Sequence, residues 1–156
     1  MTDVASSKSA GNAATQEGGA NPTSSLTWPS FYPDRCPPGD VRSAEGVVLR
    51  LVRNDPPNAN DFLPWSIENG RTDKSKPCLS CAVSVYDRLD DVRKMQRRVP
   101  AQRPKPVAEG ELKSEMGVTK PTGRKNCTHR SWWLPEGIDP SPVFSVIAPP
   151  YPQEGA

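Results

Sequence analysis

Proline restricts the folding of this chain more than any other residue does. The sequence contains 19 prolines among 156 residues, together with 11 glycines. Proline lacks a backbone N–H and its ring clashes with the preceding helical turn, so it interrupts helices. A bundle of long helices is therefore excluded. Collagen is excluded because glycine does not recur at every third position. No apolar run approaches the ~20 residues that a membrane-spanning helix needs.

Both ends of the chain are predicted to lie outside the folded domain. Ala, Ser, Gly, Thr and Asn fill 18 of the first 25 positions, and such a segment buries too little apolar surface to fold. We predict a disordered tail over residues 1–30, one domain over residues 31–148 and a flexible C-terminal tail over residues 149–156. The N-terminal segment has neither a secretory apolar stretch nor an arginine, which predicts a cytoplasmic protein with reduced thiols.

Short strands are predicted to outnumber helices. Residues 87–98 form the main predicted helix, with Asp87 as its N-cap and Leu89, Val92 and Met95 as its buried stripe. Alternation of apolar and polar side chains predicts strands elsewhere in the chain. The predicted fold class is α+β, a small and mostly antiparallel sheet with one main helix packed on it. The predicted strands span residues 47–52, 81–86, 107–112, 128–133 and 143–147, with 107–112 at a sheet edge.

The cysteines suggest a metal site. Cys78 and Cys81 form a C-x2-C pair, and Cys127 and His129 form a C-x-H pair. Three thiolates and one imidazole are a ligand set that suits tetrahedral zinc, and two residues that are two apart on a strand share one face. The 45 residues between the pairs exceed the spacing of familiar zinc modules. The alternatives are that Cys81 packs as a small apolar residue, with incidental thiols elsewhere, or that a thiol has a redox or nucleophilic role.

Basic residues gather in the middle of the chain. Residues 71–130 contain fifteen Lys and Arg against seven acids. Basic side chains contact phosphates, and an exposed tryptophan can stack on an unpaired base. The alternative is a solvated helix face with tryptophans that fill a small core. Because neighbours on a strand face opposite sides, we expect one tryptophan of the Trp132–Trp133 pair at the surface or under a loop. The predicted binding surface consists of Arg93, Lys94, Arg97, Arg98, Trp132 and Trp133.

Three residue types on predicted strands occur in the order seen in a known enzyme family. Arg50 lies on an early strand, Ser84 on a middle strand, and Glu109 or Glu111 on a later one. In order and residue type the chain resembles ADP-ribosyltransferase-like toxins, including those of the RES type, over about half its length. The resemblance implies an NAD site built from these residues. The alternative is that these side chains are ordinary solvent-facing strand residues.

These patterns predict a small cytosolic binding protein, with a structural zinc ion as a candidate stabilising element. Its expected partner is a protein or a nucleic acid that contacts the basic region 93–130, and no contact with a membrane is expected. The alternative function is an NAD-using enzyme or toxin of the ADP-ribosyltransferase-like type. The sequence has none of the phosphate-loop, dinucleotide-binding, zinc-protease or serine-hydrolase motifs that would identify another enzyme class.

Overall fold

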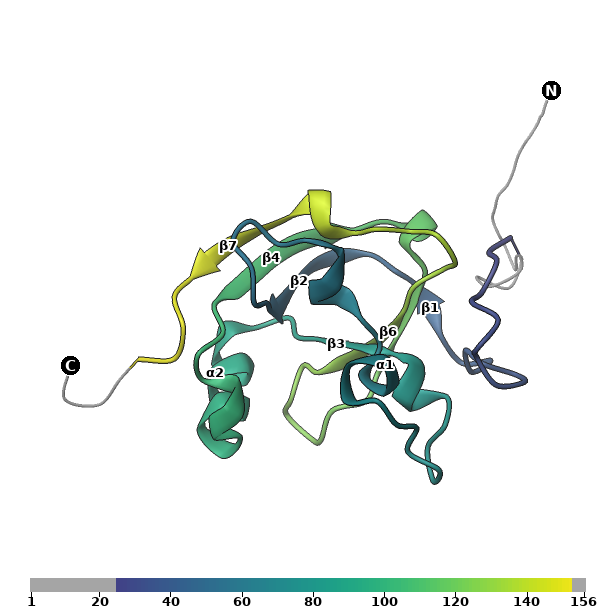
Figure 1. Cartoon of the computed structure of the whole chain (residues 1–156), viewed down its shortest axis with the longest axis horizontal. Coiled ribbons are helices and arrows are strands. Elements are labelled where there is room, and N and C mark those ends of the chain that lie inside the picture. Colours follow the sequence, from purple (N-terminus) through teal and green to yellow (C-terminus); the bar gives the residue numbers. More distant parts are fainter. Residues whose placement is uncertain (1–24, 153–156) are drawn as a thin grey trace.

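Two antiparallel sheets form the body of the molecule, which confirms the predicted α+β class (Figure 1). The computed structural model describes residues 25–152. One sheet has the strand order β1-β5-β6-β3, made by Arg42–Ser43, Val118–Pro121, Arg130–Trp133 and Val83–Val85. The other has the order β2-β4-β7, made by Gly46–Leu51, Val107–Leu112 and Phe144–Ala148. Two α-helices accompany them, α1 over Trp65–Asn69 and α2 over Leu89–Arg98.

The two sheets share one bridge and enclose the main core. Leu49 of β2 and Tyr86, just after β3, exchange backbone hydrogen bonds with N···O distances of 2.7 and 2.9 Å. Pairing between the sheets goes no further among the described residues, so the predicted single sheet is two sheets. Apolar side chains from both sheets then fill the space between them, because each strand directs alternate residues inward. The core includes Val48, Val83, Val85, Ala108, Trp132 and Phe144.

Strand β6 lies inside its sheet, between β5 and β3, and both of its faces are covered. Trp132 faces the main core, where its indole N–H donates to the Met116 carbonyl at 2.8 Å. Trp133 faces the other way, into a second cluster with Cys36 and Val118, and its indole N–H donates to the Cys78 carbonyl at 3.0 Å. Both side chains are 0% exposed. Neither tryptophan lies at the surface, and the N-terminal segment covers Trp133, which corresponds to the second alternative of the prediction, a tryptophan under a loop.

Helix α2 buries part of the predicted stripe: Val92 and, in part, Met95 pack on the cluster of Tyr86 and Leu49, and only Leu89 departs from the prediction. Val92 is 0% exposed and packs with Tyr86 and Leu49, whereas Leu89 is 38% exposed. The buried face of the helix also includes two polar residues, Asp91 and Gln96. The Gln96 amide donates to two carbonyls of the following loop, and Asp91 accepts hydrogen bonds from Thr128, so both find partners under the helix. The predicted N-cap is also wrong, because the helix begins at Leu89 and Asp87 pairs with Arg130.

The burial of α2 predicts unequal effects of two alanine substitutions on the same helix. Val92→Ala should lower the free energy of unfolding by about 1.5–3 kcal/mol, because truncation of a fully buried valine removes its apolar packing. Leu89→Ala should cost less than about 1 kcal/mol, because that side chain is already partly in water. Urea unfolding followed by far-UV circular dichroism measures both values. Equal losses for the two variants would contradict this assignment of the buried face.

The position of one strand and the extent of both predicted tails differ from the predictions. Strand β4 is the centre of its sheet and not an edge, because β7 pairs with it on the side away from β2. Part of the predicted N-terminal tail is packed: the Glu136 N–H donates to the Thr27 carbonyl at 2.8 Å, and Trp28 lies against the Trp133 cluster. At the other end, the Tyr151 N–H donates to the Arg103 carbonyl. The rest of the predicted tails, residues 1–24 and 153–156, lies outside the described residues.

A disulfide joins Cys36 to Cys78. It ties the segment before β1 to the turn before β3, beside the buried Trp133. The prediction of reduced thiols is therefore wrong for this pair. Structural disulfides persist mainly in oxidising compartments, so the predicted cytoplasmic location is not confirmed. Among residues 25–152, no helix is long and apolar enough to cross a membrane.

Candidate functional site

A basic cleft opens between helix α2 and the loop that joins β5 to β6. These two segments lie beside each other at one end of the molecule (Figure 1). The cleft has a volume of about 570 Å³, within the range of small-molecule sites. Its floor includes Tyr86, Cys127 and His129. The helix contributes one lysine and two arginines to the walls, and the loop contributes one of each. These basic residues are Lys94, Arg97, Arg98, Arg124 and Lys125.

The basic side chains of the cleft differ from their neighbours in having no acidic partner. Within residues 25–152, none of the five forms an ion pair, whereas nearby Arg130 pairs with Asp87 at 2.8 Å. Among the described residues that line the cleft, Asp91 is the one acid, and it accepts hydrogen bonds from the Thr128 hydroxyl and N–H. The hydroxyl bond in particular keeps the pKa of Asp91 below its usual value. Its charge is thus engaged inside the protein, and the cleft has a surplus of positive charge.

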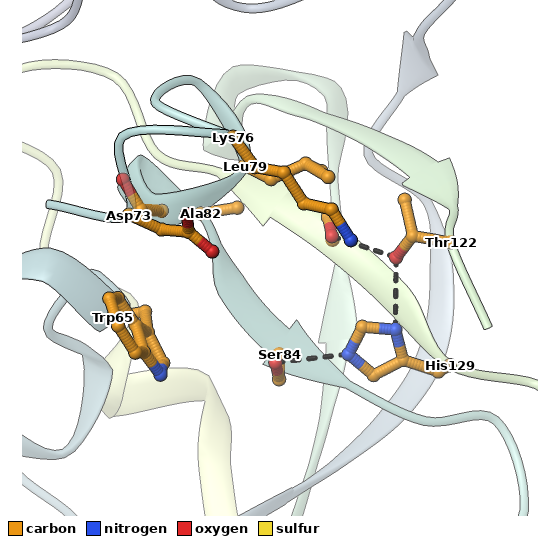
Figure 2. Close-up of a pocket in the computed structure, with 10 residues that line it drawn as sticks. Trp65, Asp73, Lys76, Leu79, Ala82, Ser84, Thr122 and His129 are labelled. Carbon is orange, nitrogen blue, oxygen red and sulfur yellow. Dashed lines mark hydrogen bonds between the residues drawn. The ribbon is translucent and has the colours of Figure 1, made fainter.

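A smaller pocket of about 210 Å³ adjoins the cleft and shares two of its residues, Thr122 and His129. Figure 2 shows a chain of polar side chains along one wall. Ser84 Oγ lies 3.0 Å from His129 Nε2, and His129 Nδ1 lies 2.9 Å from Thr122 Oγ1. Thr122 Oγ1 in turn lies 2.8 Å from Ser131 Oγ. The hydroxyl of Ser84 is therefore in hydrogen-bonding contact with an imidazole that is held from behind by a second hydroxyl.

Strand register places these side chains together. Ser84 of β3 pairs with Ser131 of β6, and Thr122 follows the pairing of β5 with β6, since its N–H donates to the His129 carbonyl at 3.1 Å. Residues 129, 131 and 133 share one face of β6, because side chains alternate along a strand. That face is apolar at Trp133, where the N-terminal segment covers it, and polar at Ser131 and His129, where it borders the pocket.

The imidazole of His129 is held in place from the side as well. Its ring packs edge-on against Tyr86, with 5.1 Å between ring centroids. Burial lowers the pKa of His129 below its usual value. A histidine with this shift is neutral at pH 7, so one ring nitrogen is free to accept a proton. The pocket is also lined by the apolar side chains of Trp65, Leu79 and Ala82 and by the charged side chains of Asp73 and Lys76 (Figure 2).

The predicted zinc ligands do not come together. Cys78 is bonded to Cys36, which leaves no thiolate for a metal. The other two cysteines lie in separate clusters: Cys81 packs beside Trp133, and Cys127 packs in the cluster of Tyr86 and Val92. In the part of the chain that the structure describes, no three His, Cys, Asp or Glu side chains could hold a metal ion. The predicted set fails because the disulfide takes up Cys78 and because the two free cysteines, Cys81 and Cys127, pack in different clusters.

The structure separates the residues of the predicted binding surface: most of its helix residues line the cleft, and its tryptophans are buried. Lys94, Arg97 and Arg98 line the cleft. Arg93 points elsewhere, since its guanidinium donates to Gln96 Oε1 and to the Pro149 carbonyl. Trp132 and Trp133 are buried and available to no partner. The loop residues that complete the cleft, Arg124 and Lys125, lie more than 25 residues after the helix in the sequence, and only the fold brings them opposite it.

The residues that carry the ADP-ribosyltransferase resemblance come together only in part. Arg50 and Ser84 line one cavity of about 240 Å³, where the Arg50 Nη1 donates to the Ser84 carbonyl at 2.8 Å. The guanidinium is buried, and it also donates to the Asp61 carbonyl. Burial lowers the pKa of Arg50 to about 10, so it stays charged at neutral pH. Glu109 and Glu111 are exposed on β4 and do not line this cavity.

No protein-family model, curated protein sequence or solved structure matches this chain. The functional interpretation therefore depends on the geometry of the cleft and of the pocket beside it. Sequence reasoning singled out Ser84 and His129 for two unrelated roles and did not join them. Their 45-residue separation hides the contact, and the register of β3 against β6 creates it.

Proposed function

We propose that the protein binds a ligand that carries phosphate groups, and that the ligand lies in the basic cleft between α2 and the β5–β6 loop. The observation that supports this proposal is the set of five basic side chains from two segments, none of them in an ion pair among the described residues. Guanidinium and ammonium groups are the side chains that recognise phosphate oxygens best. Binding would supply the negative charge that the cleft lacks.

The same geometry favours a phosphate-bearing ligand over a protein surface. Hot spots of protein interfaces are aromatic residues and arginines in desolvated pockets. Here Trp132 and Trp133 are buried, and the cleft wall is dominated by basic groups. Phosphates of this kind come from two sources, a nucleic-acid strand or a free nucleotide. Both have the same anionic chemistry, and binding measurements distinguish them.

The decisive experiment compares two double variants with the same net charge. Lys94→Glu/Lys125→Glu reverses two cleft residues, whereas Lys74→Glu/Lys113→Glu reverses two exposed lysines outside the cleft. Fluorescence anisotropy with a labelled single-stranded oligothymidylate and calorimetry with ATP measure the two ligand sources. We expect the cleft variant to bind at least about tenfold more weakly, and its salt slope to fall by about 0.7 for each strand phosphate that the protein no longer neutralises.

The control variant should bind within about threefold of the wild type, because a distant surface charge acts only through screened, long-range attraction. Tighter binding of the oligonucleotide than of ATP assigns the ligand to a strand, and the reverse assigns it to a free nucleotide. Equal weakening in the two double variants would show that net charge, and not the cleft, drives binding. Absence of binding to both ligands by the wild-type protein would overturn the proposal.

A further inference from the structure

The pocket beside the basic cleft has the parts of a nucleophilic centre. We propose that Ser84 is a nucleophile, that His129 is its general base, and that the pair hydrolyses carboxylic esters of phosphate-bearing alcohols. The phosphate part of this substrate assignment rests on the proposed function of the cleft. The nucleophile itself rests on the 3.0 Å contact between Ser84 Oγ and His129 Nε2 (Figure 2). A serine in contact with an imidazole that a third group orients is the arrangement by which a hydroxyl becomes reactive.

The orientation of the imidazole supports this assignment. Thr122 Oγ1 lies 2.9 Å from Nδ1, so an Nδ1–H that donates to this hydroxyl leaves the Nε2 lone pair directed at Ser84. The ring also packs against Tyr86, which limits its rotation. Because His129 is neutral at pH 7, Nε2 can accept the proton of the serine hydroxyl. A nucleophile and a base held by packing and by neighbouring hydrogen bonds are preorganised for proton transfer.

Ser84 is itself rigidly placed and still accessible. It is the exposed middle residue of β3, between the buried Val83 and Val85. Its carbonyl accepts a hydrogen bond from the buried Arg50 guanidinium, on the opposite side from the pocket chain. The backbone is therefore fixed on both sides, through the ladder to β6 and through Arg50. The hydroxyl remains open to a substrate in the pocket.

The two cavities determine which ester would fit. The small pocket has apolar walls at Trp65, Leu79 and Ala82, and its volume of about 210 Å³ suits a short acyl group. Lys76 and Asp73 also line this pocket, so its wall carries one charge of each sign. His129 lines both cavities, so a substrate held across it places its acyl carbon near Ser84 and its anionic part among the cleft's basic residues.

The reaction runs in two balanced steps. Ser84 Oγ attacks the carbonyl carbon while its proton passes to His129 Nε2. The bond to the alcohol oxygen breaks, and that oxygen takes the proton from the imidazolium. Water then attacks the acyl-serine ester through the same base, which releases the carboxylic acid and restores the serine hydroxyl. Because Thr122 is neutral, it stabilises the imidazolium less than a carboxylate would, which favours esters over less reactive amides.

A fluorophosphonate probe tests the nucleophile without knowledge of the natural substrate. The serine oxygen displaces fluoride from the probe's phosphorus, and intact-mass and peptide-mapping mass spectrometry locate the adduct. We expect one adduct on Ser84 of the full-length protein and none after Ser84→Ala. His129→Gln should slow labelling by about 100-fold, the lower range of general-base catalysis. Circular dichroism shows whether each variant is folded.

Ser145 provides the matched control. It is also an exposed serine on a strand, β7, and lies outside both cavities. Ser145→Ala should be labelled at the wild-type rate, and no adduct should map to Ser145. An adduct distributed over several serines, or an unchanged labelling rate in a folded His129→Gln variant, would overturn the nucleophile. A wild-type protein that is not labelled at all would do the same.

The substrate class is tested by acetate release from 1-acetylglycerol 3-phosphate and from neutral 1-acetylglycerol. We expect the phosphate-bearing ester to react at least about tenfold faster, a difference of about 1.4 kcal/mol. The Lys94→Glu/Lys125→Glu variant should lose this preference and keep its labelling by the probe. Labelling without any preference would overturn the phosphate-bearing substrate and leave the nucleophile standing. Binding of nucleotides and oligonucleotides is measured separately, so failure of the cleft proposal is recognised on its own.

Discussion

Replacing Trp132 with alanine is expected to lower the free energy of unfolding by about 3–5 kcal/mol. The indole is fully buried, stacks on Phe144 with 6.1 Å between ring centroids and meets Phe62 edge-on at 6.3 Å. Removal of the ring leaves a cavity at the meeting point of both sheets, and it also removes the donor to the Met116 carbonyl. A domain of this size has a total stability of about 5–15 kcal/mol, so the variant should be close to unfolding.

Two comparisons separate the contributions of the ring. Trp132→Phe keeps most of the apolar packing and removes the hydrogen bond and a small part of the ring volume, so it should be less destabilised than Trp132→Ala by about 1 kcal/mol or more. Denaturant unfolding, followed by circular dichroism at two wavelengths, gives the free energies. A decrease below about 1 kcal/mol in Trp132→Ala would contradict the placement of this side chain in the core between the sheets.

Loss of the Cys36–Cys78 disulfide is expected to cost about 4 kcal/mol, because the bond closes a loop with a sequence separation of 42 residues. The cost arises mainly in the unfolded chain, whose conformational freedom the cross-link restricts. It should be large here, since the N-terminal segment packs on the Trp133 cluster beside this bond and the cross-link holds it there. Thermal unfolding of Cys36→Ser, compared with the wild type, measures the effect.

Reduction provides an internal control for this prediction. Dithiothreitol should lower the melting temperature of the wild-type protein by reducing the disulfide. It should do the same to Cys127→Ser, because Cys127 has a free thiol and its replacement leaves the disulfide in place. It should leave the melting temperature of Cys36→Ser unchanged, because that variant has no disulfide to reduce. The pairing would be contradicted if dithiothreitol left the melting temperature of the wild-type protein unchanged. It would also be contradicted if mass spectrometry showed four free thiols after purification without reductant.

The sequence pattern predicted an element correctly where the packing around that element agrees with its local preference. Strand β4 occupies the predicted residues 107–112, and helix α2 ends at Arg98, where Pro100 follows. The strand predicted over 81–86 is shorter, because Leu79–Cys81 forms a 3-10 turn instead. Strand β5 was not predicted at all. Its four residues begin after a glycine and end at a proline, which is too short a span for alternation to show.

The errors at the candidate site have the same physical origin. The lysine and arginines of α2 were found because they lie on one helix, within a few residues of one another. The zinc set failed because the spacing of cysteines in the sequence does not show that Cys78 pairs with Cys36, or that Cys81 and Cys127 pack in different clusters. The sequence marks Ser84 and His129 separately, but their contact needs the register of β3 against β6, which depends on the packing of Trp132 and Val83.

The sequence by itself determined the fold class of this protein: prolines at short intervals limit helix length, and alternating residues favour strands. It also determined that the middle of the chain is basic. These effects arise between residues that are close in the sequence, so they do not depend on the tertiary fold. Only the tertiary structure decided which faces are buried, which cysteines pair and which polar groups meet. Such choices depend on side chains that are far apart in the chain and compete for the same space. A serine and a histidine 45 residues apart become neighbours only when both sheets have closed over their core.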